Sequence, residues 1–325
     1  MKGLTDIAGV RVGHASDYEG ITGCTAILCE AGAVAGYDIR GSAAGTEEFE
    51  VMSPLHLTEK VHAVMLAGGS AFGLEAASGV RRFLEQKGIG FETGAAKVPL
   101  VPAAILYDLG IGKSTVRPTR EMGEAAAAAA TAEAVQEGAV GAGTGATVGK
   151  LFGMSRAMKG GVGSFTVPLE GALAGVKVSA LAVVNALGDV IDPATGRPIA
   201  GARVSAGSME LVNSAAAMKK GATGGFRREN TTLAVVATNA RLSKVGATKL
   251  AQMAGVGMAR AVAPVWTMSD GDLVIALSLG NERADINSLG VAAAEAVAQS
   301  ILRAVRMAPS LGGVPGLFAA GNRKP

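Results

Sequence analysis

Hydrophobic residues follow two periodicities along this chain, and together they predict alternating strands and helices. Short uninterrupted apolar runs, rich in Val, Ile and Leu, are typical of strands buried on both faces. Longer stretches with apolar residues every three or four positions are typical of helices with one buried face. Strands are expected at 7–14, 21–37, 61–67, 176–184, 231–238 and 273–279, and helices at 74–87, 120–137, 243–261 and 286–305. Strands covered by helices indicate a layered α/β fold.

The segments between these elements carry turn-forming residues. Proline at positions 193 and 198 favours an irregular loop over 190–205, and 208–220 fits either a helix or a mobile arm. Residues 219–230 are polar, cationic and glycine-rich, which is typical of a linker or an exposed processing loop. The helix over 243–261 is expected to turn five residues inward: Val245, Leu250, Met253, Gly257 and Met258.

Composition adds that the interior is filled largely by small residues. The chain has 325 residues, of which 49% are hydrophobic, 18% charged and only 4% aromatic, with 47 glycines. Such hydrophobicity excludes a disordered chain, and the length fits two domains or one large one. The net charge of +3 comes from interspersed charges that form no basic stripe. We therefore expect no nucleic-acid partner.

Several common kinds of active site are disfavoured by the motifs that are present. The three histidines are scattered, without a metal-ligand spacing, so no metal is expected. The segment from Gly68 to Phe72 has Phe where a serine-hydrolase elbow needs its second Gly. The segment from Gly143 to Leu151 is similar to a phosphate-binding loop, but its glycine spacing is wrong and Leu151 replaces the magnesium-binding Ser or Thr.

The location of the protein is predicted from its apolar segments. The first residues begin no hydrophobic core of a secretory signal. No run approaches 18 uncharged apolar residues, so we expect no membrane association and a cytoplasmic protein.

The junction between Asn230 and Thr231 admits a specific chemistry. If this peptide bond were cut, Thr231 would carry a hydroxyl nucleophile and its own α-amine as a base. An α-amine has a pKa of about 8, so it is partly neutral at physiological pH and replaces histidine as the base. The same hydroxyl could first attack the carbonyl of Asn230. The local pattern alone is more typical of an ordinary loop leading into a strand.

A series of motifs in a fixed order resembles a known family. They include residues 4–14, 22–25, 40–46, 68–74, 140–146 and 230–233. In these motifs the chain is similar, over nearly its whole length, to self-processing N-terminal-nucleophile hydrolases. That family includes L-aminopeptidase/D-esterases, β-aminopeptidases and nylon-oligomer hydrolases, and the last branch is the most similar in the site residues.

The resemblance implies a four-layer αββα sandwich, formed by a single domain over 1–325. It also implies cleavage of the chain into a large chain, 1–230, and a small chain, 231–325, that begins with the nucleophile. The resulting units are expected to assemble into tetramers. No metal or organic cofactor is implied.

The resemblance also assigns roles to individual residues. Thr231 matches the nucleophile, and Asn185 matches the asparagine whose amide donates to the developing oxyanion, although it is also typical of a turn. Asp270 and Asp272 match a pair of acids that would hold the ammonium of Thr231, with a solvated Asp-Gly turn as the alternative.

Two further assignments remain open between alternatives. Lys150 matches the active-site lysine of the nylon-oligomer branch, and Lys159 competes with it because the alignment there is loose. The segment Gly68, Gly69 and Ser70 either lines the substrate pocket or only makes a tight turn.

The function implied is an autoprocessing amide hydrolase acting on linear amides such as 6-aminohexanoate oligomers. The alternatives are an aminopeptidase acting on short peptides, an ornithine acetyltransferase, and an uncleaved scaffold that binds a small molecule. In each enzymatic case the partner is a small substrate.

Overall fold

One continuous sheet organises the protein, whose computed structural model describes residues 1–223 and 230–319. Its strands run in the order β10-β11-β14-β16-β2-β4-β7-β3, and β1 pairs with β2. The sheet strands are β1 (Arg11–Asp17), β2 (Thr22–Ile39), β3 (Gly45–Glu47), β4 (Lys60–Ala67), β7 (Ala103–Ile105), β10 (Gly161–Pro168), β11 (Lys177–Asn185), β14 (Thr231–Ala240) and β16 (Leu273–Glu282). The helices are α1 (Glu75–Gln86), α2 (Arg120–Ala128), α3 (Ser214–Lys219), α4 (Lys244–Ala261) and α5 (Ile286–Arg306).

The remaining strands are short and lie outside this sheet. They form three small sheets, in the orders β13-β12-β15, β5-β6 and β8-β9. These strands are β5 (Phe91–Glu92), β6 (Lys97–Val98), β8 (Thr147–Val148), β9 (Met158–Lys159), β12 (Asp189–Asp192), β13 (Arg197–Ala200) and β15 (Val262–Ala263).

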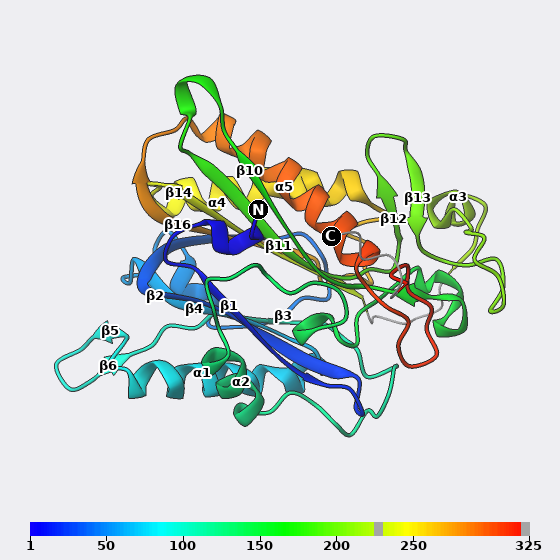
Figure 1. The fold of residues 1–325 in the computed structure, drawn as a ribbon, viewed down its shortest axis with the longest axis horizontal. Helices are drawn as coiled ribbons and strands as arrows, with labels where there is room; N and C mark the ends of the chain where they lie inside the picture. Colours follow the sequence, from blue (N-terminus) through cyan, green and yellow to red (C-terminus); the bar gives the residue numbers. More distant parts are fainter. Residues whose placement is uncertain (224–229, 320–325) are drawn as a thin grey trace.

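The long strand β2 connects the two halves of the sheet. Its first part, 22–28, pairs with β1 and β4, and its last part, 34–39, pairs with β16. The register with β4 shifts between Leu28 and Ala33, so the strand is irregular where the halves meet. Figure 1 shows α4 and α5 over the half that contains β10, β11, β14 and β16, and α1 and α2 under the half that contains β4.

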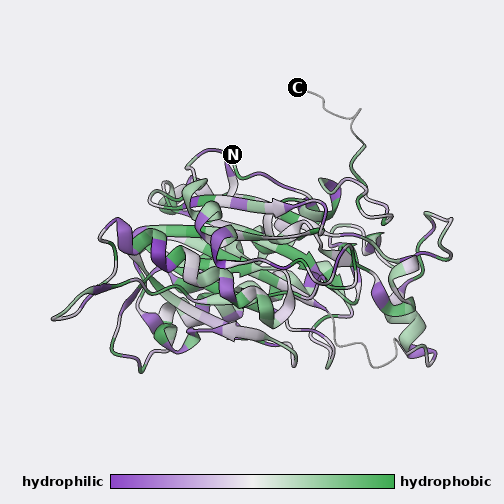
Figure 2. Cartoon of the chain, turned by 90° about the horizontal axis from the view of Figure 1, so that it is seen from below, coloured by the Kyte–Doolittle hydropathy of each residue, from purple (hydrophilic) through white to green (hydrophobic). Residues whose placement is uncertain are grey.

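Three hydrophobic cores separate the four layers. One lies between the α4/α5 pair and the sheet, one between the two halves of the sheet, and one against α1 and α2. Neighbours on one strand belong to different cores: Met65 faces α1 and α2, whereas Leu66 faces the other half of the sheet. Both faces of the strands are therefore buried, which explains their uninterrupted apolar runs. Hydrophobic residues are concentrated in these inner strands (Figure 2). The αββα order is the expected one.

The strand order brings three segments to one edge of the sheet. Strand β11 ends at Asn185, and its antiparallel neighbour β14 begins at Thr231, the register partner of Asn185. Strand β16 runs parallel to β14 and begins at Leu273, so the residues just before it lie at the same edge. Asn230 forms a bridge with Asp270 there. Segments that are far apart in the sequence thus meet because of the strand order.

The helix predicted over 120–137 is wrong beyond Ala128, where α2 ends. Residue Thr131 instead exchanges two backbone hydrogen bonds with Val12 of β1, of 3.0 and 3.1 Å. Pairing with a strand needs extended backbone, so it outweighs the helix propensity of the alanines.

The loop predicted over 190–205 is also wrong, because it contains the hairpin of β12 and β13. Gly196 closes the turn with φ +68° and donates its N–H to the Asp192 carbonyl. Pro198 is tolerated because β13 is an edge strand. Within 208–220 the structure has the short helix α3. Part of the predicted processing loop, residues 224–229, lies outside the described residues.

Five residues of α4 were predicted to face inward, and for Val245 this prediction is wrong. It is 66% exposed, because it lies in the first turn beside an open surface cleft, before the helix packs on the sheet. Leu250, Gly257 and Met258 are buried and Met253 is partly buried.

Helix α5 is the one described helix whose length and composition would allow it to cross a membrane. Its mean hydropathy reaches 1.2, but 72% of that window is buried inside the protein. A buried core helix passes the same test, so this is weak evidence for a membrane span.

Candidate active site

Thr231 opens β14 with its side chain directed toward the space between the two halves of the sheet. It is 3% exposed, and its hydroxyl donates to the carbonyl oxygen of Asn230 at 2.5 Å. The same carbonyl oxygen accepts the backbone N–H of Gly271 at 2.8 Å. A Cβ on Gly271 would lie 2.8 Å from the Thr231 hydroxyl oxygen, so this backbone approaches closely only because residue 271 is glycine. The structure thus places a hydroxyl, a peptide carbonyl and an N–H donor together.

Asp270 and Asp272 lie on either side of Gly271, and both are buried. Asp270 accepts the backbone N–H of Thr267 at 3.0 Å and its hydroxyl at 2.5 Å. Asp272 accepts the N–H of Thr232 at 2.6 Å and that of Trp266 at 3.2 Å. These contacts make the pair part of an ordered site, unlike the solvated turn that was the alternative.

The surroundings of the two carboxyl groups favour their protonated, neutral form. Burial raises the pKa of Asp270, and burial together with the charge of Asp270 raises the pKa of Asp272 to about 7. The ammonium of Lys150 acts in the opposite direction on both groups. A cation close to the pair would therefore be favoured.

Hydrogen bonds hold both the oxygen and the nitrogen of the Asn185 side-chain amide. Its carboxamide oxygen accepts the N–H of Thr147 at 3.0 Å and the ammonium of Lys150 at 2.8 Å. Its Nδ2 donates to the carbonyl oxygen of Tyr107 at 3.0 Å. Lys150 also donates to the Asn185 carbonyl oxygen at 3.0 Å. The amide is therefore oriented, and its oxygen is turned toward a positive charge.

The two candidate lysines occupy different places. Lys150 contacts Asn185 and acts on the two acids, as described above. Lys159 is wholly buried and donates to the carbonyl oxygens of Thr144 at 2.9 Å and Ala146 at 2.6 Å. Burial lowers the pKa of Lys159 to about 7, and Asp108 is the nearby charge that opposes this shift. The geometry brings Lys150, and not Lys159, to the residues around Thr231.

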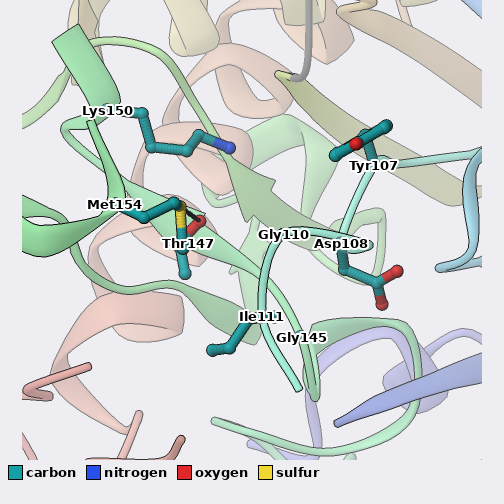
Figure 3. Close-up of a pocket in the computed structure, with 8 residues that line it drawn as sticks. All are labelled: Tyr107, Asp108, Gly110, Ile111, Gly145, Thr147, Lys150 and Met154. Atoms are coloured by element: carbon teal, nitrogen blue, oxygen red, sulfur yellow. Dashed lines mark hydrogen bonds between the residues drawn. The ribbon is translucent and has the colours of Figure 1, made fainter. Parts of the chain in front are cut away.

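A small pocket opens beside Lys150. Figure 3 shows Lys150 reaching toward the segment that carries Tyr107 and Asp108, whose side chains leave the backbone in opposite directions. The described residues that line it are Tyr107, Asp108, Gly110, Ile111, Gly145, Thr147, Lys150 and Met154.

The segment Gly68, Gly69 and Ser70 is not among the described residues that line this pocket, but Gly69 donates its N–H to Asp108, which is one of them. Gly69 and Ser70 have φ values of +80° and +55°, so the segment makes a tight turn. Ser70 donates its N–H to the Leu106 carbonyl oxygen at 2.9 Å, which ties the turn to the segment that leads to the pocket.

Sequence reasoning missed the groups that orient the site. They are the Tyr107 carbonyl, the Thr147 N–H, the Thr267 hydroxyl and the Gly271 N–H. Three of these four are backbone groups, whose role cannot be recognised from the residue type. A usable signal was Asp108, an acid at the end of the apolar segment 98–107. Among residues 1–223 and 230–319, no three His, Cys, Asp or Glu side chains gather as a metal site would require.

The layered αββα fold brings a hydroxyl, two acids, an amide and a lysine together at one edge of the sheet. Residues 2–318 match the model of Peptidase family S58, and the chain belongs to that family. It is therefore a member of a peptidase family, as the sequence motifs predicted.

Individual relatives cover nearly the whole chain. An uncharacterized aminopeptidase of Mycobacterium tuberculosis is 38% identical over 97% of this chain and 96% of its own length. The 6-aminohexanoate-oligomer endohydrolase of a Kocuria species is 29% identical over 93% of this chain and 85% of its own. The solved L-aminopeptidase D-Ala-esterase/amidase of Ochrobactrum anthropi has the same fold, with a TM-score of 0.74 at 20% identity over 97% and 88% of the two chains. Its structure is described as a variant of the Ntn hydrolase fold.

Proposed function

We propose that this protein is a self-processing amide hydrolase whose nucleophile is the hydroxyl of Thr231. Membership of a peptidase family supports hydrolysis in general. The observation that carries the particular proposal is the contact of the Thr231 hydroxyl with the carbonyl of the preceding residue, Asn230, at 2.5 Å. In the uncut chain the nucleophile is thus already beside the bond that must break to unmask its amine.

Self-cleavage would proceed by transfer of an acyl group within the chain. The Thr231 oxygen attacks the Asn230 carbonyl carbon, and the charge that develops on the carbonyl oxygen is stabilised by the Gly271 N–H. The C–N bond breaks, the nitrogen receives the proton that the hydroxyl lost, and an ester remains. Water then hydrolyses the ester, which leaves a carboxylate on Asn230 and a free amine and hydroxyl on Thr231.

Turnover would use the same hydroxyl on an external amide. The freed amine of Thr231 accepts the hydroxyl proton and delivers it to the leaving nitrogen, and water later releases the acyl group. Asn185 donates its amide to the substrate oxyanion, and Lys150 polarises that amide through its oxygen at 2.8 Å. Asp270 and Asp272 favour the ammonium form of Thr231 and so set its pKa.

We propose linear amide oligomers of the 6-aminohexanoate type as the first substrate class. The endohydrolase relative supports it, and so does the combination of Lys150 with the acids at 270 and 272. An aminopeptidase that releases N-terminal residues is the second candidate, and the mycobacterial relative at 38% identity favours it.

The intact mass under denaturing conditions tests self-cleavage. We expect the native chain to give pieces of about 23 and 9 kDa, and Thr231→Ala to stay whole at 32.3 kDa. Thr232→Val is the matched control, because the described structure gives the Thr232 hydroxyl no hydrogen-bond partner. A native chain that stays whole after long incubation would contradict the proposal and favour the binding scaffold.

The substrate class is tested with paired substrates on the cleaved enzyme. Linear 6-aminohexanoate oligomers are offered with a free and with an acetylated amine, beside amino-acyl p-nitroanilides. Endo-cleavage predicts release of new amines from both oligomers, since it needs no terminal amine. Activity confined to substrates with a free amine would overturn the oligomer proposal and support the aminopeptidase.

A further inference from the structure

Three glycine-rich motifs of the sequence meet at one buried side chain that the proposed reaction does not use. Asp108 follows β7 and is 4% exposed. One carboxylate oxygen accepts the N–H of Gly69 at 2.6 Å, and the other accepts the hydroxyl of Thr22 at 2.7 Å. These donors belong to two of the motifs, 68–74 and 22–25.

The third motif, 140–146, packs directly on the same carboxylate. A Cβ on Gly145 would lie 2.6 Å from an Asp108 oxygen, and one on Gly68 would lie 2.1 Å from it. Either side chain would overlap the carboxylate, so both glycines are explained by this close approach. The motifs are thus parts of one packed unit around Asp108.

Lys159 completes this unit as the nearby positive charge. Each of the two groups shifts the pKa of the other toward its charged form, against the effect of burial. The ammonium also holds the carbonyl oxygens of Thr144 and Ala146. Asp108 and Lys159 therefore fix two backbone segments, 106–108 and 144–147, relative to one another.

These two segments supply the backbone contacts that orient Asn185. Tyr107, adjacent to Asp108, accepts from the amide nitrogen, and Thr147, adjacent to Ala146, donates to the amide oxygen. If either segment moved, the direction of the amide N–H bonds would change. Asp108 and Lys159 thus reach the amide through these two backbone segments.

We propose that Asp108, together with Lys159, is a positioning residue that orients the Asn185 amide toward the substrate oxyanion. The inference rests on the proposed function, in which Asn185 stabilises that oxyanion. Asp108→Asn replaces an acceptor by a donor opposite an existing donor and leaves Lys159 without its counter-charge. The motifs at 22, 68 and 145 then serve catalysis by holding the Asp108 carboxylate in place.

A double-mutant cycle on cleaved enzyme tests the proposal, with kcat and KM expressed per cleaved chain. Asn185→Ala is expected to lower kcat by about 10²- to 10³-fold. Asp108→Asn is expected to lower kcat by about 10- to 100-fold with little change in KM, because the oxyanion donor is misplaced. In the double variant the second substitution should add almost nothing, because both act through the same amide.

Losses in kcat that multiply in the double variant would overturn the inference while leaving the proposed function intact. Native kcat in Asn185→Ala would instead contradict the proposed oxyanion donor itself. Glu137→Gln is the control, because Glu137 also accepts a backbone N–H and pairs with a cation, Arg303, away from this site. It should keep the native kcat.

Thr22→Val provides a second cycle if Asp108→Asn does not fold. It removes one hydroxyl donor to Asp108 and keeps the shape of a side chain that is 2% exposed. We expect a smaller fall in kcat that again disappears when Asn185 is alanine. An unchanged kcat in Thr22→Val, or a fall that persists without Asn185, would contradict the inference.

Discussion

Asp272 is almost wholly buried, and each of its carboxylate oxygens accepts a backbone N–H group. Burial raises its pKa to about 7, and the charge of Asp270 adds to the effect. A positive charge beside Asp272 in addition to Lys150 would favour its carboxylate form, and the proposed cleavage would create one as the ammonium of Thr231. The same residue predicts how the stability of the uncut chain depends on pH.

The uncut Thr231→Ala chain is expected to lose stability as the pH rises from about 4 to 7. An unfolded Asp has a pKa of about 3.9, so over this range the unfolded chain releases a proton that folded Asp272 retains. Each unit of difference in pKa corresponds to about 1.4 kcal/mol, so the loss is a few kcal/mol at most.

Urea unfolding of Thr231→Ala at several pH values measures this loss. Adding Asp272→Asn should reduce the slope of the unfolding free energy with pH, whatever it does to the stability itself. An equal slope in both chains would show that Asp272 is not the group responsible.

Among the elements, helices α4 and α5 approach each other closely through small residues. A Cβ on Gly257 of α4 would lie 2.0 Å from the Ala294 carbonyl oxygen of α5. Gly246, at the start of the same helix, has no neighbour closer than 3.4 Å. The two glycines therefore have different reasons to be present.

Gly257→Ala is expected to destabilise the protein by about 1–3 kcal/mol, because the methyl group forces the helices apart. Gly246→Ala is the matched control and should be neutral or stabilising by up to about 1 kcal/mol, because alanine favours the helix. Thermal unfolding of both variants compares them. Equal melting temperatures would contradict the close packing of α4 on α5.

At the scale of the whole molecule, the two pieces of the proposed cleavage share one sheet. The small chain would supply β14, β16, α4 and α5, and β14 lies between β11 and β16. Its strand pairs on both sides belong to one continuous sheet, with β11 on one flank and β2 on the other. Separation would expose two of the three cores.

We therefore expect the two pieces of the cut protein to elute together from a sizing column without denaturant. Light scattering on the same column measures whether the eluted particle has the mass of one 32.3 kDa unit or of four such units, which tests the proposed tetramer. Pieces that separate in native buffer would contradict the shared sheet.

Much of the fold could be predicted from local patterns. The strand over 231–238 and the helix over 286–305 are present nearly as predicted, because residues buried on one or both faces leave a periodic signal. The helix over 120–137 failed beyond residue 128, since the chain there pairs with β1, more than 100 positions away. Local propensity carries no information about such a partner.

The candidate site, like the fold, could be predicted from the sequence only in part. The sequence by itself determined which residues have the chemistry: a hydroxyl at Thr231, acids at 270 and 272, and an amide at 185. It favoured Lys150 over Lys159 without excluding the latter, and it gave no role to Asp108. The tertiary structure separated these residues, because strand order determines which side chains face the same cavity. Backbone groups such as the Gly271 N–H acquire their function only from that placement, since every residue but proline carries one.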